Sequence, residues 1–445
     1  MNRKWRARLA LPVCALTFLA GPARSQAPAK ADPPPATAQS APSNEELALR
    51  IDALTRELEA RKLGDVSDPA PAAGKEGKWG LGPAASKVYG KSSGLSIGGY
   101  GEALYQNFDS TREDGQPSGK TNEWDYLRAV LYVGWKFDRT FVLNSEIEYE
   151  HSSTGKGGEV SVEFATLDAM LRDEVNLRAG LVLVPMGIVN EMHEPPTYLG
   201  ARRTDTETRI IPTTWRANGI GVFGAAGPVA YKLYVTESLD AASFTAANGI
   251  RGGRQSGARA TADNLSFSGR ADLVSVPGLL VGAAFFTGDS GKDLSVAGQA
   301  FGARTTAWDL HADLRLGGLA LRGMYARVRI EDVDLLNRYL GLTGNKSVGE
   351  EQEGYYLSAG YELLSRLSPG TSMALTPFVR YERTDTQKEV PDGWARDGAN
   401  DREAWTVGID YKPIPGIALK VDWQDYSNAA GTGVPQWNVA LSYLF

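Results

Sequence analysis

Between Pro185 and Ala217 the sequence gathers side chains that could either bind an anion or neutralise one another. Arginine guanidinium groups match the oxygens of phosphate or carboxylate with paired hydrogen bonds, which lysine cannot do. Acidic residues lie among these arginines, so mutual neutralisation is an equally open interpretation. The arginines and the nearby acids are Arg202, Arg203, Arg209, Arg216, Glu194, Asp205 and Glu207.

The same stretch interrupts the pattern of its surroundings. Alternating apolar and polar residues, which predict strands, flank it on both sides. Inside it the alternation stops and four prolines appear. A structureless loop of this length in a compact domain is usually functional. We therefore predict that residues 186–217 form a loop folded into the lumen of a β-barrel, where the loop narrows a pore.

Two motifs that resemble catalytic or cofactor signatures lack the context that would support them. Gly94-Leu-Ser96-Ile-Gly98 fits the nucleophile elbow of hydrolases, but no helical pattern follows it. The glycines from Gly219 to Gly224 match a dinucleotide fingerprint without the strand and helix that should flank it. An outer-membrane hydrolase using Ser96 or a luminal carboxylate stays an alternative without an evident nucleophile–base pair. We expect no enzymatic activity and no cofactor.

The histidines and acids give no convincing metal site. The three histidines lie in different segments, and the only cysteine, Cys14, lies near the N-terminus, so we do not expect a transition-metal site. Glu146, Glu148 and Glu150 share one face of a predicted strand and could bind a divalent cation at the rim. A solvated acidic face of the lumen is the favoured interpretation.

The N-terminus has the features of an export signal. Four basic residues precede the apolar run from Leu9 to Ala20, and small residues suitable for cleavage end at Ala27. Because the run is too short for a membrane-spanning helix, we predict that residues 1–27 are a signal peptide. Its removal would leave 42 basic and 53 acidic residues, a net charge of −11 that argues against a nucleic-acid partner.

Three segments are predicted between the signal peptide and the barrel. Residues 28–42 are rich in Pro and Ala and should form a disordered spacer. Residues 43–63 carry Leu and Ile at spacings of four, three and four, a coiled-coil seam that is marginal for one isolated helix. The seam therefore suits several chains together, although a solvated amphipathic helix without a partner is equally open. Residues 64–93 are predicted to be a linker.

From Gly94 onward, alternating segments indicate sixteen strands whose connections are alternately short and long. An even strand number with tight turns at one rim and long loops at the other is typical of outer-membrane barrels. We predict an all-β, 16-stranded antiparallel transmembrane β-barrel over residues 94–445, located in the bacterial outer membrane. The predicted strands are 94–108, 122–137, 139–151, 158–171, 175–185, 218–226, 228–239, 264–275, 278–288, 304–316, 318–331, 354–365, 372–384, 402–413, 416–427 and 436–445.

The predicted strands place apolar residues on one face and charged residues on the other. Leu419 and Val421 share one face of their strand, while Lys420 and Asp422 share the opposite face. A dry protein core would not tolerate full charges in strand after strand, but a water-filled lumen would. Aromatic residues at strand ends also fit the girdles found at membrane interfaces. The apolar faces are therefore predicted to contact lipid.

Basic side chains on the inward faces could form a series along the pore wall. Such a series would concentrate anions and still allow their release. The same faces carry many acidic residues, so selectivity for anions does not follow from the basic residues alone. The candidates are Arg128, Lys136, Arg178, Lys232, Arg270, Arg315, Arg322, Arg380, Lys412 and Lys420.

Three segments within and after the loop resemble one particular family. Asn190-Glu-Met-His-Glu-Pro-Pro-Thr-Tyr198, Ile210-Ile-Pro-Thr-Thr-Trp-Arg216 and Gly219-Ile-Gly221 look like the phosphate-selective porin O and P family. The resemblance extends over much of the barrel and includes the N-terminal helix. It implies a homotrimeric outer-membrane channel whose constriction is lined by basic side chains. The last strand, ending at Phe445, resembles the closing strands of outer-membrane proteins, which implies recognition by the barrel assembly machinery.

The sequence thus predicts a porin for passive diffusion of small anionic or polar solutes, such as phosphate. Its surroundings would be outer-membrane lipid and lipopolysaccharide. Two alternatives stay open. The loop arginines could be structural ion pairs in a general or cation-leaning porin, or the barrel could be an outer-membrane anchor that tethers the cell wall through the coiled coil.

Overall fold

The computed structural model describes residues 50–52, 77–155, 157–368 and 370–445 of the 445-residue chain. Residues 50–52 have helical backbone and belong to a separate N-terminal unit, residues 1–59. The predicted signal peptide, the spacer and most of the predicted coiled-coil helix lie outside the described residues. No helix in the described part of the chain is long and apolar enough to cross a membrane.

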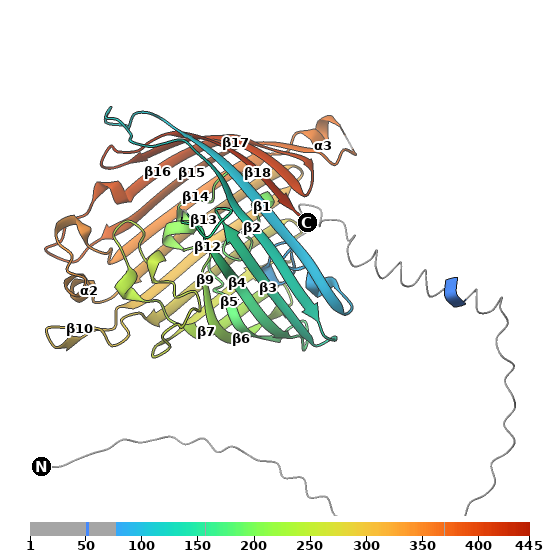
Figure 1. Cartoon of the computed structure of the whole chain (residues 1–445), viewed down its shortest axis with the longest axis horizontal. Helices are drawn as coiled ribbons and strands as arrows, with labels where there is room; N and C mark the ends of the chain where they lie inside the picture. The colour runs from blue at the N-terminus through green and yellow to red at the C-terminus, as the bar shows by residue number, and fades with distance from the viewer. Residues whose placement is uncertain (1–49, 53–76, 156, 369) are drawn as a thin grey trace, which may run out of the picture. The chain divides into compact units, whose positions relative to one another are not determined.

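Sixteen antiparallel strands close into a barrel, because every strand pairs with two neighbours and β1 pairs with both β2 and β18 (Figure 1). This closure confirms the predicted fold class. Two short strands, β10 (Ser295–Val296) and β11 (Gln299–Ala300), form a separate sheet within one loop. The barrel strands are β1 (Gly94–Phe108), β2 (Glu123–Lys136), β3 (Phe141–Glu150), β4 (Val160–Ala169), β5 (Asn176–Leu183), β6 (Arg216–Ala226), β7 (Val229–Glu237), β8 (Leu265–Leu273), β9 (Leu279–Asp289), β12 (Arg304–Leu316), β13 (Leu319–Ile330), β14 (Glu351–Tyr361), β15 (Ala374–Glu389), β16 (Asp401–Ile414), β17 (Ile417–Asn428) and β18 (Gln436–Leu444).

Tight turns join the strands at one rim of the barrel. Gly227 and Pro228 connect β6 to β7, and Gly227 has a φ of 60°, a left-handed conformation that glycine adopts without strain. The connections at the other rim are longer. Short helical segments lie outside the strands: η1 (Lys78–Gly80), η2 (Lys87–Gly90), η3 (Pro195–Thr197), η4 (Thr206–Ile210), η5 (Ala241–Ser243), η6 (Arg251–Gly253), α2 (Val333–Tyr339), η7 (Gly344–Lys346), α3 (Leu364–Leu367) and η8 (Gly398–Asn400).

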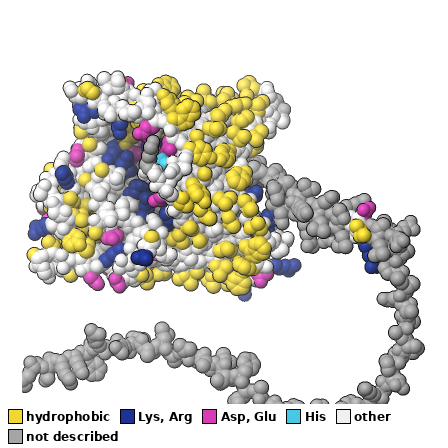
Figure 2. Space-filling view, in the orientation of Figure 1, with side chains coloured by type: hydrophobic (Ala, Val, Ile, Leu, Met, Phe, Trp, Pro, Cys, Tyr) yellow, Lys and Arg dark blue, Asp and Glu magenta, His cyan; other side chains and the backbone are white. Residues whose placement is uncertain are grey.

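Strand side chains point alternately outward and into the lumen. In β17, Val421 is 44% exposed whereas the adjacent Lys420 is 1% exposed, so the apolar side chain faces out and the charged one faces in. Hydrophobic side chains cover the strand region on the face seen in Figure 2. A belt of aromatic rings crosses β12 to β16, with neighbouring ring centroids 4.8–6.4 Å apart; it comprises Trp308, Tyr325, Tyr355, Tyr381 and Trp405. This outer surface suits lipid and a membrane interface.

Residues 77–93, here called the N-terminal strap, pack inside the ring of strands (Figure 1). Leu81, Val88 and Tyr89 of the strap are buried against inward-facing side chains of the wall such as Tyr132 and Phe164. The prediction of a linker over 64–93 did not anticipate this packing. The strap therefore occupies part of the lumen beside β1 to β4.

The loop between β5 and β6 also lies inside the barrel. Its apolar residues Met186, Ile210 and Trp215 are buried in a cluster with wall residues that include Phe286 and Met324. The Trp215 and Phe286 rings lie 4.6 Å apart. The loop is therefore packed against the wall from within, as its sequence predicted.

Candidate functional site: a loop across the barrel lumen

The loop of residues 186–217, here called the luminal loop, is held through its backbone carbonyl groups. The donors are basic side chains of the barrel wall on β12, β13, β15, β16 and β17. Lys420 on β17 donates to three carbonyl oxygens of the loop at 2.6–3.0 Å. Lys412 and Arg315 each donate to a further loop carbonyl at 2.7 Å. Arg322 donates to the Thr197 carbonyl and Arg380 donates to the Arg202 carbonyl, each at 3.2 Å. Five cations of the wall thus bind the loop backbone and fix its position across the lumen.

Carboxylates of the wall hold the loop by its N–H groups. Asp422 accepts from the Ala201 N–H at 2.6 Å, and Asp309 accepts from the Gly187 N–H at 2.9 Å. Within the loop, Glu207 accepts from two backbone N–H groups at 2.9 and 3.0 Å. Charge-assisted hydrogen bonds of this kind are stronger than neutral ones. They hold a segment that has no regular ladder of its own.

Replacing Lys420 with Met should weaken the attachment of the loop. The change leaves the carbonyls of Tyr198 and Gly200 without a described donor and removes the cation that lies 3.7 Å from the buried Asp410 carboxylate. We expect it to lower the free energy of unfolding by about 3 kcal/mol. Urea unfolding of the purified protein in detergent measures this effect. The matched control is Lys388→Met, because Lys388 on β15 is exposed and pairs with Glu353 at the surface; we expect less than about 1 kcal/mol for it. Equal effects of both changes would contradict the anchoring role.

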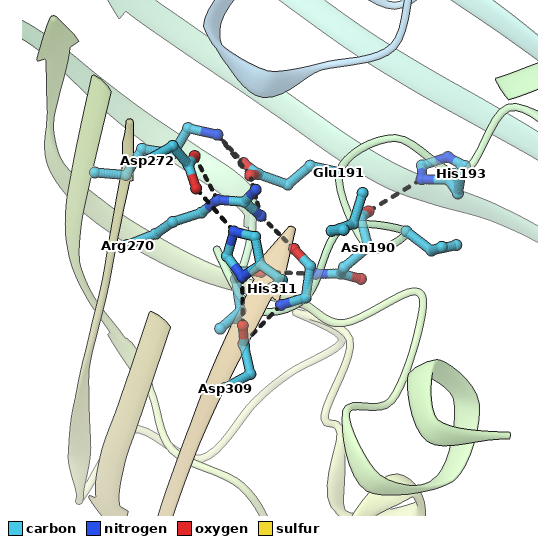
Figure 3. A network of polar contacts seen from close by, with 12 residues as sticks. Asn190, Glu191, His193, Arg270, Asp272, Asp309 and His311 are labelled. Atoms are coloured by element: carbon cyan, nitrogen blue, oxygen red, sulfur yellow. Dashed lines mark hydrogen bonds and ion pairs between the residues drawn. The ribbon is translucent and has the colours of Figure 1, made fainter. Parts of the chain in front are cut away.

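A charged network anchors the start of the loop (Figure 3). His311 lies between two carboxylates, with its ring nitrogens 2.6 Å from Asp309 and 2.8 Å from Asp272. Arg270 pairs with Asp272 at 2.7 Å and also donates to the carbonyl of Gly187. The buried charges therefore neutralise one another, as buried ions require.

The N-terminal strap contacts the same loop. Glu194 of the loop accepts from the backbone N–H groups of Ala84 and Ala85, both at 2.9 Å. Burial raises the pKa of the Glu194 carboxyl to about 7, although these two hydrogen bonds act in the opposite direction. The Tyr89 hydroxyl donates to Asp168 on β4 at 2.6 Å. The strap is thus attached to both the loop and the wall.

Two of the four arginines predicted at the constriction are ion-paired. Arg216 is the first residue of β6 and lies 2.6 Å from Glu163. Arg209 lies 3.1 Å from Asp205, one turn earlier in the loop. For these two arginines the geometry matches the interpretation of structural ion pairs.

Arg202 and Arg203 differ from that pair, because neither forms an ion pair with a carboxylate of the described residues. Arg203 donates to the His193 carbonyl at 3.3 Å. The Nε of Arg203 is buried and has no hydrogen-bond partner in the part of the chain that the structure describes. Neither charge is therefore neutralised by an acid in direct contact, although the charge of Arg202 helps to lower the pKa of Asp205.

Arg251 and Arg254, at η6 in the loop after β7, join the luminal loop and were not predicted as site residues. They donate to carbonyl oxygens of the luminal loop at 2.9 and 2.7 Å, and neither pairs with a described carboxylate. Burial lowers the pKa of Arg251, and the charges of Arg254, Arg203 and Arg209 lower it further. The sequence signal was the run Arg251-Gly-Gly-Arg254 in a long loop. Four arginines that belong to the luminal loop or donate to it form no ion pair with a described carboxylate and are here called the unpaired arginines: Arg202, Arg203, Arg251 and Arg254.

The ten basic residues predicted to line the lumen all make contacts inside the barrel. Six of them bind loop carbonyls: the five described above, and Arg270, which donates to Gly187 within the network in Figure 3. Arg178 and Lys136 bind Tyr89 of the strap at 2.9 and 3.4 Å. Arg128 lies 3.4 and 3.6 Å from two wall carboxylates, and Lys232 pairs with a carboxylate of the loop. Most of their donors are therefore engaged by protein groups.

A cavity of about 360 Å³ lies between the luminal loop and β12 to β16. Most of the charged residues in its lining are basic, with Arg315, Arg322, Arg380 and Lys412 contributed by the wall. Asp313 lines the same cavity and is paired with Arg322. The luminal loop thus has the strap on one side and a basic cavity on the other.

The closed barrel, its lipid-compatible outer surface and its inward loop define a porin-like barrel of the bacterial outer membrane. Two solved porins show the shared fold. OmpF of Salmonella typhi, in complex with daunomycin, has a TM-score of 0.52 and 13% identity over 80% of this chain and 99% of that chain. An anion-selective porin from Comamonas acidovorans has a TM-score of 0.50 and 13% identity over 79% of this chain and 100% of that chain.

Sequence comparison identifies a relative of the chain. An uncharacterized protein of Aquifex aeolicus (strain VF5) is 36% identical over 379 residues, which cover 82% of this chain and 83% of the relative. The chain belongs to the same family as that protein. No family model matches the sequence.

Proposed function

We propose that the protein is a porin for passive diffusion of small anions, phosphate among them. The observation that carries this proposal is the group of four unpaired arginines at and beside the luminal loop. Low-dielectric walls around a narrow aqueous passage strengthen the field of such charges and concentrate anions there. The resemblance of the loop to the phosphate-selective porin O and P family supports phosphate as one of the solutes.

Reversal potentials in planar bilayers test the proposal directly. Purified protein under a potassium chloride gradient should give a potential with the sign of anion selectivity. Added phosphate should reduce the chloride current, because guanidinium groups bind its oxygens more tightly. A cation-selective pore that is indifferent to phosphate would contradict the proposal.

The ion pairs of the loop favour a second candidate, a general or cation-leaning porin. Arg209 and Arg216 are neutralised by Asp205 and Glu163, so they add little net charge to the passage. In this case the unpaired arginines would be balanced by acidic wall residues further away. The same bilayer measurement separates the candidates, because this pore would favour potassium or neither ion.

We also propose that the protein is a homotrimer surrounded by lipid and lipopolysaccharide and inserted by the barrel assembly machinery. The continuous aromatic belt supports β12 to β16 as the lipid-facing side. The strands on the opposite side would then be available for contacts between subunits. Chemical cross-linking of the protein in outer-membrane vesicles, read as a trimer band, tests the stoichiometry.

A further inference from the structure

Four neighbouring polar groups of the luminal wall have no hydrogen-bond partner in the described part of the chain. They are the Nη1 of Arg322, the hydroxyl of Ser358, the Nε of Arg380 and the hydroxyl of Thr406. These residues lie opposite one another on β13, β14, β15 and β16, each paired in register with the next. Register partners point to the same face of a sheet about 5 Å apart. The four groups therefore form a row, and each residue is at least nine-tenths buried.

All four groups can donate a hydrogen bond. Two are guanidinium N–H groups and two are hydroxyl groups, and buried donors without an acceptor are unfavourable. A single acceptor group with two oxygens could accept from neighbouring members of the row, whose backbones are about 5 Å apart. Glu382 lies 3.6 Å from the Nε of Arg380, an ion pair outside hydrogen-bond geometry that partly neutralises this member of the row. The row thus has the composition of an oxyanion-binding site whose hydrogen-bond donors the protein's own side chains do not fill.

The row borders the cavity beside the luminal loop. Arg322, Ser358 and Arg380 line that cavity, whose volume of about 360 Å³ suits a small organic molecule. The loop contributes apolar groups to the lining, among them Pro196 and Leu199. The loop also contributes Arg203 and Thr204 to the lining. The cavity therefore combines a polar, basic wall with apolar groups of the loop at Pro196 and Leu199.

The remaining contacts of Arg322 limit the kind of anion. Its Nε and Nη2 are already bound to Asp313, and Nη2 also donates to the Thr197 carbonyl. Arg322 therefore offers one N–H group and not the paired fork that suits phosphate. Asp313 and Glu362 also line the cavity and repel a dianion more strongly than a monoanion.

We propose that the cavity-lining members of the row, Arg322, Ser358 and Arg380, bind the carboxylate of a small amphipathic monoanion, such as an aromatic carboxylate, with its apolar body against the luminal loop. This inference rests on the proposed anion porin and names a class of solute for it. The carboxylate oxygens accept from the row, and the ring lies against Pro196 and Leu199.

Isothermal titration calorimetry of the detergent-purified protein with benzoate, acetate and inorganic phosphate tests the inference. Benzoate should bind, and acetate and phosphate should bind at least about tenfold more weakly, since acetate lacks the ring and phosphate carries the additional charge. Ser358→Ala should weaken benzoate binding about tenfold through the loss of one hydrogen bond to a charged group. Ser358 makes no hydrogen bond through its side chain to a described residue, so the variant should fold normally.

Ser268→Ala is the matched control. Ser268 on β8 is also buried with a hydroxyl that lacks a described partner, but it does not line the cavity. Benzoate binding that is unchanged in Ser358→Ala, or equally weakened in Ser268→Ala, would overturn the inference. Phosphate binding as tight as benzoate binding would also overturn it.

The outcome is distinguishable from that of the proposed function. Anion-selective reversal potentials without benzoate binding would remove this inference and leave the anion porin standing. Benzoate binding that depends on Ser358 in a pore that excludes anions would support the site and remove the proposed permeation.

Discussion

Replacing the four unpaired arginines together with glutamine should shift the pore from anion selectivity toward cation selectivity. At a distance of about 6 Å, one unit charge changes the energy of a passing ion by about 0.7 kcal/mol in water and about 3 kcal/mol at an effective dielectric constant of 20. Four such charges should therefore change the anion-to-cation permeability ratio by at least about tenfold. Reversal potentials under a potassium chloride gradient measure this ratio.

A matched variant removes the same number of charges at residues that neither belong to the luminal loop nor donate hydrogen bonds to it. Four arginines whose side chains are 32–62% exposed are suitable, since each pairs with an acid: Arg112, Arg304, Arg338 and Arg396. Their replacement by glutamine should leave the permeability ratio nearly unchanged, because salt screens exposed charges over about 8–10 Å. Equal shifts in the two variants would mean that total charge, and not the position of the arginines, sets selectivity.

Deleting residues 77–90 should increase the single-channel conductance. The N-terminal strap packs inside the lumen, so its removal leaves a wider aqueous section beside β1 to β4. We expect an increase on the order of twofold, since current through a pore grows with its open section. Single-channel recording in planar bilayers measures it.

The conductances can be compared only if the barrel of the deletion variant is folded. The mobility of the unboiled protein on a denaturing gel reports closure of the sheet in the deletion variant. Tyr89→Phe is the control, since it removes the hydroxyl bonded to Asp168 but keeps the strap in place; its conductance should equal that of the unchanged protein. A folded deletion variant with unchanged conductance would show that ions do not pass on the side of the strap.

The barrel was predictable because strand alternation is a local signal. Neighbouring residues such as Lys420 and Val421 reveal opposite faces of a strand, and repetition along the chain gave the sixteen strands and the closed sheet. The inward loop was predictable for the complementary reason, since residues 186–217 lack that alternation. The observed strand ends lie within a few residues of the predicted ones; β6, for example, begins at Arg216 and not at residue 218.

The contacts that determine the lumen were not predictable from local pattern. Glu194 binds Ala84 and Ala85, which lie more than a hundred residues earlier and looked like part of a linker. Lys420 binds backbone carbonyls. Because every residue has a carbonyl, the sequence does not indicate which ones accept these hydrogen bonds. Arg251 joins the site through the same kind of contact. The sequence could therefore show which charged side chains face inward. It could not show which of them are already bound by other groups of the protein.

The seam between β1 and β18 has a consequence for the making of the protein. Phe445 exchanges two backbone hydrogen bonds with Gly99, at 3.0 and 3.1 Å. Every other pairing in the barrel joins strands that follow one another along the chain and can form as hairpins. The pairing of β1 with β18 can form only after the last strand is present. Until then the nascent sheet carries two bare edges, which are templates for pairing with foreign chains. We therefore expect assembly to require a partner that covers both edges of the sheet until β1 and β18 pair.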